Sequence, residues 1–277
     1  MELYDETCFE CSKLITQKYS TSFSKGINAF HKRFRYPVYA IYGFVRFADE
    51  IVDTFHGHDQ LQLLDRFEQQ VFDAIREKVS LNPVLQSFQL IVNQYQIEHG
   101  LIRSFLAAMR MDIEKKTYSE TEYKNYIHGS AEVIGLMCLR IFCEGDEVLY
   151  KQLMPPAVSL GSALQKINFL RDMKADEQER SRVYFPGVDP GHFDEQAKKL
   201  VEQDIRHDLD AGFKGIGALP AGARLGVYIA YTYYLELFRK LSRTPASVVL
   251  QKRIRIPDAQ KTLLYCKAVL RYKLGMI

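Results

Sequence analysis

Apolar side chains recur every three to four residues along almost the whole chain, and runs of strict alternation are scarce. A period near 3.6 residues is typical of helices that bury one face, whereas alternation would indicate strands. The predicted helices cover residues 5–19, 37–55, 60–79, 83–97, 101–115, 120–143, 194–213, 220–243 and 257–274, and one more opens at Pro155 and Pro156 and carries residues 172–176. The sequence therefore predicts an all-α fold.

The expected ends of these helices follow from proline, glycine and polar residues. Pro37 suits the first turn of the second helix, which is expected to stop at His56 and Gly57. The stretches 19–25 and 177–191 are polar and are expected to be connections. No repeat or low-complexity linker interrupts the periodicity, so we expect residues 1–277 to form one all-helical domain.

Two of the predicted helices carry a narrow polar stripe on an otherwise apolar surface. The stripe residues are Tyr42, Arg46, Asp49 and Asp53 on the first of them, and Gln165, Asn168, Asp172 and Asp176 on the second. Successive members are three or four residues apart, which returns each to the same helix face. Both helices are therefore expected in the middle of a bundle.

The stripes contain two aspartate pairs, Asp49/Asp53 and Asp172/Asp176. Carboxylates one turn apart in apolar surroundings repel each other and need positive compensation. Mg²⁺ prefers a few carboxylates together with substrate phosphates, so two facing pairs predict a metal clamp for a diphosphate. Two other interpretations stay open: solvated surface charges, and a buried salt-bridge network with Arg46 and Arg171.

Composition excludes several other functions. Apolar residues at 47 % and charged residues at 26 % are ordinary for a globular protein, and a net charge of +3 with no long basic run argues against a nucleic-acid partner. Five cysteines suit reduced thiols in the cytoplasm. Residues 1–10 do not resemble a secretory signal, and no stretch approaches the ~18 uninterrupted apolar residues of a membrane helix.

Five ordered motifs carry a resemblance to a known family. They are Ser20-Thr-Ser-Phe23, Arg46-x-x-Asp49-x-x-x-Asp53, the segment Tyr126–Gly135, Gln165-x-x-Asn168-x-x-Arg171-Asp172-x-x-x-Asp176, and Arg182-x-Tyr184-Phe-Pro186. Together they resemble the squalene and phytoene synthase family over nearly the whole chain, and the overall pattern is most similar to bacterial phytoene synthases.

The resemblance implies a bundle of the type I isoprenoid synthase kind with a central cavity. It also implies a prenyltransferase of carotenoid biosynthesis that joins two geranylgeranyl diphosphates head to head, through a cyclopropyl diphosphate, into phytoene. One alternative is a squalene or dehydrosqualene synthase that uses farnesyl diphosphate. Another, from a different class, is a non-catalytic helical assembly factor that retains the fold.

The resemblance and the chemistry of the side chains assign roles to particular residues. The expected metal ligands are Asp49, Asp53, Asn168, Asp172 and Asp176. The expected catalytic residues are the same four aspartates with Arg46, Tyr42 and Tyr126. The expected substrate contacts are Ser20, Ser22, Arg46, Gln165, Asn168, Arg171, Tyr234, Arg253, Gly135 and Gly161. Mg²⁺ is the expected cofactor, with Mn²⁺ as an alternative, and no NADPH is expected because the glycines at 215 and 217 do not continue into a dinucleotide fingerprint.

Some features depart from the family pattern or lie outside it. Glu132 stands where the family usually has a small residue, and its side chain could face away from the cavity or narrow it. No C-terminal membrane anchor of the eukaryotic squalene synthase kind is expected. Because substrate and product are lipids, we expect a cytoplasmic protein with transient contact at the inner membrane face, to which the basic segment 251–255 could contribute. Downstream carotenoid enzymes are candidate partners.

Overall fold

The computed structural model describes residues 2–180, 182–186 and 193–277, without the side chains at 21–22 and 177–180. In this part of the chain the helices are α1 (Leu3–Tyr19), α2 (Thr21–Ile27), α3 (Lys32–Asp53), α4 (Gln60–Glu77), α5 (Pro83–Tyr95), α6 (His99–Glu114), α7 (Glu120–Ile127), the π-helical turn η1 (His128–Glu132), α8 (Val133–Cys143), α9 (Glu147–Arg180), α10 (Glu195–Ile216), α11 (Ala221–Ser242), α12 (Ala246–Val249) and α13 (Asp258–Lys273). The predicted all-α fold is confirmed.

Polar caps start several of these helices where the sequence supplies them. The Asp59 side chain accepts a backbone N–H of the first turn of α4, and Asn82 does the same for α5, which has Pro83 at its first position. Ser119 and Glu122 form a reciprocal capping box at the start of α7. These local signals explain why α4, α5 and α7 begin close to the predicted residues.

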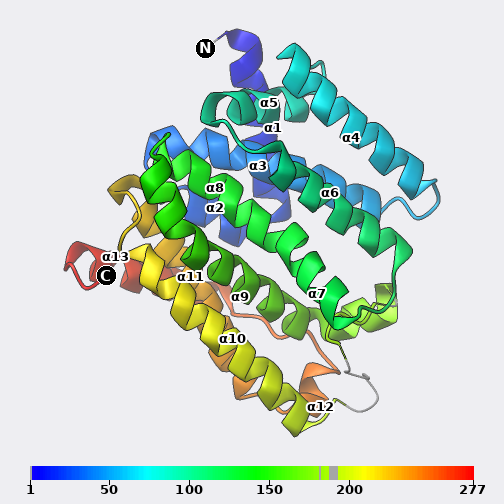
Figure 1. Cartoon of the computed structure of the whole chain (residues 1–277). Coiled ribbons are helices and arrows are strands. Elements are labelled where there is room, and N and C mark those ends of the chain that lie inside the picture. The colour runs from blue at the N-terminus through cyan, green and yellow to red at the C-terminus, as the bar shows by residue number, and fades with distance from the viewer. Residues whose placement is uncertain (1, 181, 187–192) are drawn as a thin grey trace.

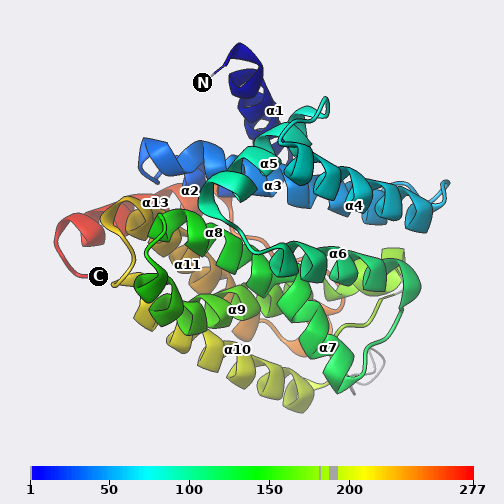
Figure 2. The same cartoon turned by 45° about the horizontal axis from the view of Figure 1, so that its top comes forward.

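Helix α9 lies in the middle of the molecule (Figure 1). It packs against α10, α8 and η1, and less extensively against α11. Helices α1, α4 and α5 gather at one end, where α1 and α5 cover α3 (Figures 1 and 2). Helix α3 also contacts α6 and α8, and α8 packs against α9, so α8 touches both helices with predicted polar stripes.

One continuous cluster of buried hydrophobic residues runs from Phe9 to Ala268. Its aromatic centre is Phe44 of α3, whose ring stacks on Phe88 with centroids 4.0 Å apart and lies 5.2 Å from Phe105. Packing of this kind, rather than helix propensity, provides most of the stability of helices in proteins.

Several predicted boundaries are wrong. Helix α3 starts at Lys32, so Pro37 lies inside the helix and is buried there. Helix α9 starts at Glu147, ahead of Pro155, and continues past the predicted end to Arg180. Helix α2 starts inside the polar stretch 19–25 and continues to Ile27, and its first turn is capped by the Ser20 side chain. In α3, burial of Phe34 and of Pro37 to Ala40 outweighs the missing proline N–H.

One stretch of the described chain, Glu120–Cys143, has the length and composition of a membrane-spanning helix. More than half of it is buried inside the protein, and it packs against α6 and α9. It therefore occupies the position of a core helix in this fold.

Candidate active site

A cavity of about 1390 Å³ lies in the centre of the bundle. Its wall contains residues of α2, α3, α8, α9, α10, α11 and α13. Pockets for a single drug-sized ligand usually measure roughly 300–1,000 Å³. The cavity therefore has room for more than one ligand of that size.

The wall of the cavity changes from apolar to acidic along α9. Cavity-lining residues of α9 run from Leu153 to Asp176, which is about 35 Å at the helical rise per residue. The apolar end includes Phe30, Leu139, Phe142, Leu153, Pro156, Ile216 and Leu219. The other end contains Asp49, Asp53, Asp172 and Asp176, so all four carboxylates of the two predicted pairs share one cavity.

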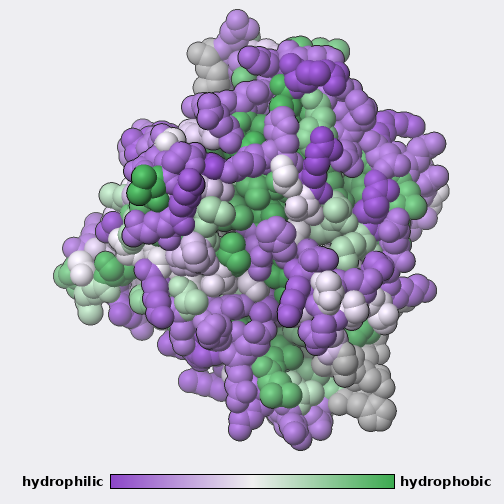
Figure 3. Space-filling model, viewed as in Figure 1, coloured by the Kyte–Doolittle hydropathy of each residue, from purple (hydrophilic) through white to green (hydrophobic). Residues whose placement is uncertain are grey.

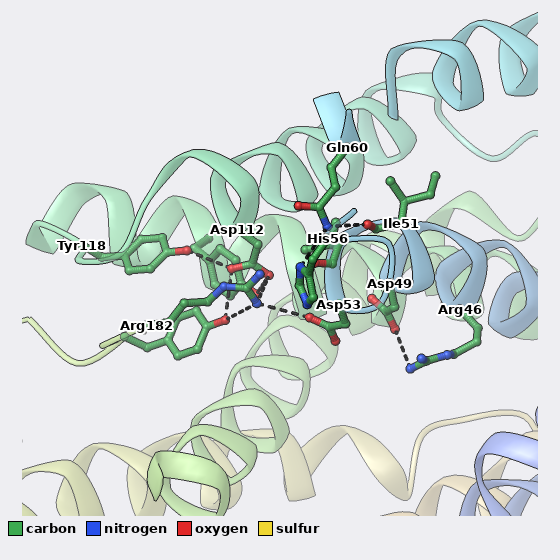
Figure 4. Close-up of polar contacts among 12 residues, drawn as sticks. Arg46, Asp49, Ile51, Asp53, His56, Gln60, Asp112, Tyr118 and Arg182 are labelled. Carbon is green, nitrogen blue, oxygen red and sulfur yellow. Dashed lines mark hydrogen bonds and ion pairs between the residues drawn. The ribbon is translucent and has the colours of Figure 1, made fainter. Parts of the chain in front are cut away.

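Asp49 is a weakly compensated carboxylate at the acidic end. Burial raises its pKa to about 7, the carboxylates of Asp53 and Asp112 act in the same direction, and Arg46 opposes them. The opposing cation is distant, because Arg46 Nη1 lies 3.9 Å from Asp49 Oδ2 while the other terminal nitrogen of Arg46 pairs with Glu50. Figure 4 shows Arg46 approaching Asp49 from outside the pair. Arg46 therefore compensates the negative charge of Asp49 only weakly.

The donor set at this end suits a hard divalent cation. Asp49, Asp53, Asn168, Asp172 and Asp176 all present oxygen atoms to the cavity, and the raised pKa of Asp49 is what an uncompensated carboxylate produces. Within the described residues, no three His, Cys, Asp or Glu side chains converge into a ready-made metal site. An ion shared between two carboxylates and phosphate oxygens needs no such convergence.

Asp172 is held by two arginines. Arg171 donates to it with Nε 3.0 Å from Oδ1, and Arg253 Nε lies 2.6 Å from the same oxygen. The alternative of a salt-bridge network thus holds for this carboxylate, with Arg253 in addition to the expected Arg171. Both arginines line the cavity. Because a guanidinium fork also matches phosphate, they can exchange the carboxylate for a diphosphate.

The other predicted residues are distributed as follows. Ser20, Tyr42, Tyr126, Gln165, Asn168, Tyr234, Gly135 and Gly161 line the cavity, and the Tyr234 hydroxyl lies 3.3 Å from Asn168 Oδ1. Arg46 does not line the cavity; it forms an ion pair with Glu50 and lies over the ring of Tyr19. The side chain of Ser22 lies outside the described part of the chain. The roles of these residues remain predictions.

Gly161 and Glu132 lie where α9 and η1 come into close contact. A Cβ on Gly161 would lie 3.0 Å from Glu132 Cα, so the glycine allows α9 to touch η1. Glu132 itself does not line the cavity; its carboxylate lies 2.9 Å from His128 Nδ1. Its pKa is raised by burial, partly offset by His128. Glu132 therefore faces away from the cavity and does not narrow it.

A buried carboxylate that the sequence analysis missed completes the acidic end. Asp112 of α6 lines the cavity and accepts hydrogen bonds from Tyr118 (2.9 Å), Tyr126 (2.6 Å) and Tyr184 (3.0 Å). Burial raises its pKa, which Arg182 at 3.6 Å and the three hydroxyls counteract. Figure 4 shows the Arg182 guanidinium between Asp112 and Asp53. Asp112 thus links Tyr126 to the first aspartate pair.

A local signal for Asp112 does exist. The buried stripe of α6 passes through Ile102, Phe105 and Met109, and Asp112 continues it at helical spacing. A lone carboxylate on such a stripe is rarely buried without a partner, which marks it as unusual. Its partners Tyr118 and Tyr184 could not be assigned from spacing, because they lie on connections outside the helices.

Comparison with known proteins gives the family. A family model described as squalene/phytoene synthase matches residues 16–260. The chain belongs to the squalene/phytoene synthase family. Members of this family are prenyltransferase-type enzymes, so the resemblance and the predicted enzyme class are confirmed. Prenyl diphosphates are the substrates that the family uses.

Individual relatives agree with this assignment. The chain is similar to a phytoene synthase of Arthrospira platensis, with 26 % identity over 95 % of the chain and 93 % of the relative. It is also similar to a 15-cis-phytoene synthase of Synechocystis, with 25 % identity over 96 % of the chain and 86 % of that protein.

Solved structures show the same fold at lower identity. The crystal structure of a dehydrosqualene synthase superposes with a TM-score of 0.82 and 21 % identity over 97 % of the chain and 98 % of that structure. The squalene synthase HpnC of Alicyclobacillus acidocaldarius gives a TM-score of 0.77 and 19 % identity over 88 % and 98 % of the two chains. The bundle is therefore the all-α isoprenoid synthase fold.

Proposed function

We propose that the protein condenses two geranylgeranyl diphosphates head to head into phytoene, through a cyclopropyl diphosphate, in carotenoid biosynthesis. The observation that carries the proposal is one cavity, about 35 Å long along α9, with two aspartate pairs at one end and a largely apolar wall over the rest of its length. Similarity to curated phytoene synthases over more than nine-tenths of the chain supports the choice of product.

The reaction proceeds in two parts. The C–O bond of one substrate breaks to give an allylic cation and diphosphate; the double bond of the second substrate attacks the cation, loses a proton and forms the cyclopropyl diphosphate. Loss of the second diphosphate, rearrangement and loss of a proton then give phytoene. No net oxidation or reduction occurs, so NADPH is not required.

The acidic end is suited to both departures of diphosphate. Mg²⁺, or Mn²⁺ in its place, would be held by Asp49, Asp53, Asn168, Asp172 and Asp176 and would stabilise negative charge on the leaving diphosphate. Arg171 and Arg253 release Asp172 and donate to diphosphate oxygens. Ser20 and Tyr234 line the same part of the cavity with hydroxyl groups that can donate further hydrogen bonds.

The remaining wall protects the cationic intermediates. The ring of Tyr126 is 3 % exposed and its hydroxyl is fixed by Asp112, so the face of the ring is held in place without offering a mobile nucleophile. Tyr42 lines the cavity from α3 one turn before Arg46. Aromatic faces stabilise nearby positive charge, and an apolar enclosure excludes the water that would capture it.

The setting of the reaction is part of the proposal. We place the protein in the cytoplasm with peripheral contact at the inner membrane face, because both substrate and product are lipids. Enzymes that consume phytoene are the proposed partners downstream.

Product analysis tests this function. Purified protein is incubated with Mg²⁺ and either geranylgeranyl or farnesyl diphosphate, with and without NADPH, and the hydrocarbons are identified. Phytoene from the first substrate without NADPH is expected. Formation of squalene or dehydrosqualene from farnesyl diphosphate would show that the alternative function is correct and the proposed one is wrong.

Variants of the acidic pairs test whether the protein is a catalyst at all. Asp49→Asn and Asp172→Asn are expected to abolish activity with folding retained, and Asp210→Asn, on the exposed side of α10, serves as the control. Absence of turnover in the wild type with either substrate would favour the non-catalytic assembly factor.

A further inference from the structure

The outer face of α13 exposes a row of large apolar side chains. Leu263, Leu270 and Leu274 are 68 %, 58 % and 64 % exposed, and Met276 just beyond the helix is 56 % exposed. The spacing of 263, 270 and 274 keeps the leucines on one side of the helix. Figure 3 shows hydrophobic residues at the tip of the molecule that carries the C-terminal end of the chain. A contiguous exposed apolar row is a usual mark of a binding surface.

Basic residues accompany this row. Lys267, Arg271 and Lys273 are exposed, and no ion pair engages them among the residues that the structure describes. Residues 251–277 contain seven basic residues and one acidic residue, whereas the chain as a whole has a net charge of +3. The other 250 residues are therefore net acidic, and the positive charge of the protein is concentrated around α13.

The inner face of the same helix borders the cavity. Thr262, Leu264 and Tyr265 line it, and Ala268 packs into the protein. Several cavity-lining residues are also exposed, which locates an opening between α2 and the segment leading into α13: Phe23, Lys25, Arg253, Arg255, Asp258 and Thr262. A single helix, about 10 Å wide, separates the exposed leucines from the cavity.

We propose that the outer face of α13, made up of Leu263, Lys267, Leu270, Arg271, Lys273, Leu274 and Met276, docks on the surface of an anionic lipid bilayer. The leucines enter the boundary between headgroups and acyl chains, and the basic side chains contact the lipid phosphates. This places the opening of the cavity beside the bilayer, so prenyl chains reach it without crossing water. The inference rests on the lipid substrates of the proposed function.

A second exposed patch provides an internal comparison. Leu3 and Leu81 are 81 % and 94 % exposed, and Tyr4 joins their segments by donating a hydrogen bond to the Ser80 carbonyl. The charged residues nearest to it in sequence are Glu2, Asp5 and Glu6 beside Leu3 and Lys78 before Leu81, so acids outnumber bases there. Anionic lipid is therefore expected to repel it, although it also exposes leucine side chains.

The absence of tryptophan from the sequence allows a direct test. Leu270→Trp and Leu81→Trp each introduce a single tryptophan, one on each patch. With vesicles of phosphatidylcholine and phosphatidylglycerol, the emission of L270W is expected to shift to the blue and to return on addition of salt, while that of L81W stays constant. Changing Lys267, Arg271 and Lys273 to Gln in L270W is expected to weaken vesicle binding on the order of 100-fold.

Three results would overturn the docking proposal. They are no blue shift of L270W, an equal shift with pure phosphatidylcholine, or a shift that follows protein concentration without vesicles, which would identify a second copy of the chain as the occupant. Turnover of detergent-dispersed substrate by the wild type is measured separately. If it fails while L270W still binds anionic vesicles, the proposed function is wrong and the docking surface stands.

Discussion

Arg182 joins the two aspartate pairs to each other: its Nη1 lies 3.3 Å from Asp53 Oδ1, and its backbone N–H donates to the Asp176 carbonyl at 2.8 Å. The same guanidinium lies 3.6 Å from Asp112 (Figure 4). Arg182 is 8 % exposed and is 129 residues from Asp53 in sequence. One buried residue, through its guanidinium and its backbone N–H, thus connects the two helices that carry the acidic motifs.

Replacing this guanidinium should impair the site even when charge is retained. Arg182→Lys keeps a positive charge but offers no planar fork to reach Asp53 and Asp112 together. We expect kcat/KM to fall by about 10- to 100-fold, with a loss of roughly 1–3 kcal/mol in the free energy of unfolding. Arg110→Lys, at the exposed pair with Asp65, is the control. Unchanged kcat/KM in R182K would show that the link is not needed for catalysis.

Two of the tyrosines that donate to Asp112, Tyr118 and Tyr126, allow a structural role to be distinguished from a catalytic one. Tyr118→Phe and Tyr126→Phe each remove one hydroxyl donor to this buried carboxylate, so each should cost about 1–3 kcal/mol of stability. Of these two tyrosines, Tyr126 lines the cavity and Tyr118 does not. We therefore expect both variants to lose similar stability by chemical denaturation, while only Y126F loses kcat. Equal losses of kcat would mean that Asp112 acts on the site through its whole environment rather than through Tyr126.

Asp49 should make the metal-free protein less stable as pH rises. Its pKa is raised by burial to about 7, above the ordinary value near 3.9, so the folded state binds the proton more tightly than the unfolded chain. The favourable contribution of Asp49 to the free energy of unfolding is complete below pH ~4 and is lost as the pH rises to about 7. Asp49→Asn removes the ionisation, so we expect its melting temperature in chelator to exceed that of the wild type at pH 8 by at least about 2–4 °C, with little difference near pH 4.

The same melting curves for Asp210→Asn give the baseline for loss of an exposed carboxylate. A difference between Asp49→Asn and the wild type that does not depend on pH would contradict the assignment of the raised pKa to this residue.

The rows of polar residues on α3 and α9 could be predicted because they depend only on helical geometry. Spacings of three and four residues place Asp49 with Asp53, and Asp172 with Asp176, in any helix, and the surrounding apolar residues indicate that these helices are central. The start of α3 could not be predicted in the same way. Pro37 has a strong local preference for a first turn, which the tertiary burial of Phe34 and of Pro37 to Ala40 overrides.

Contacts between distant segments account for the rest of the site. Arg182 reaches Asp53, and Tyr184 reaches Asp112 across 72 residues, through a connection whose path no periodicity describes. The Arg253–Asp172 pair spans 81 residues and was not predicted, since the motif position indicated only a diphosphate contact for Arg253. The pairs Arg46–Glu50 and His128–Glu132 are both i, i+4 contacts, so helical spacing allows them. Spacing alone does not predict that these side chains take these partners instead of facing the cavity, because that depends on how the helices pack.

The apolar end of the cavity should set the length of the prenyl chain that the enzyme accepts. Phe30 and Phe142 both line this end, with ring centroids 5.1 Å apart. Shortening Phe142 to Leu opens space there, so a longer chain can extend further before it meets the wall. We expect the ratio of kcat/KM for geranylgeranyl over farnesyl diphosphate to rise about tenfold in F142L, since differences of a few apolar groups in a pocket have effects of this size.

Phe34→Leu is the matched control for Phe142→Leu. Phe34 packs edge-on against Phe142 at 5.5 Å and is fully buried, but it does not line the cavity. Both changes remove a similar volume from the same aromatic cluster, so similar losses of stability are expected. If F34L shifts the substrate ratio as much as F142L, the effect comes from general loosening of the cluster. If neither variant shifts it, the length of the accepted chain is determined elsewhere along the wall.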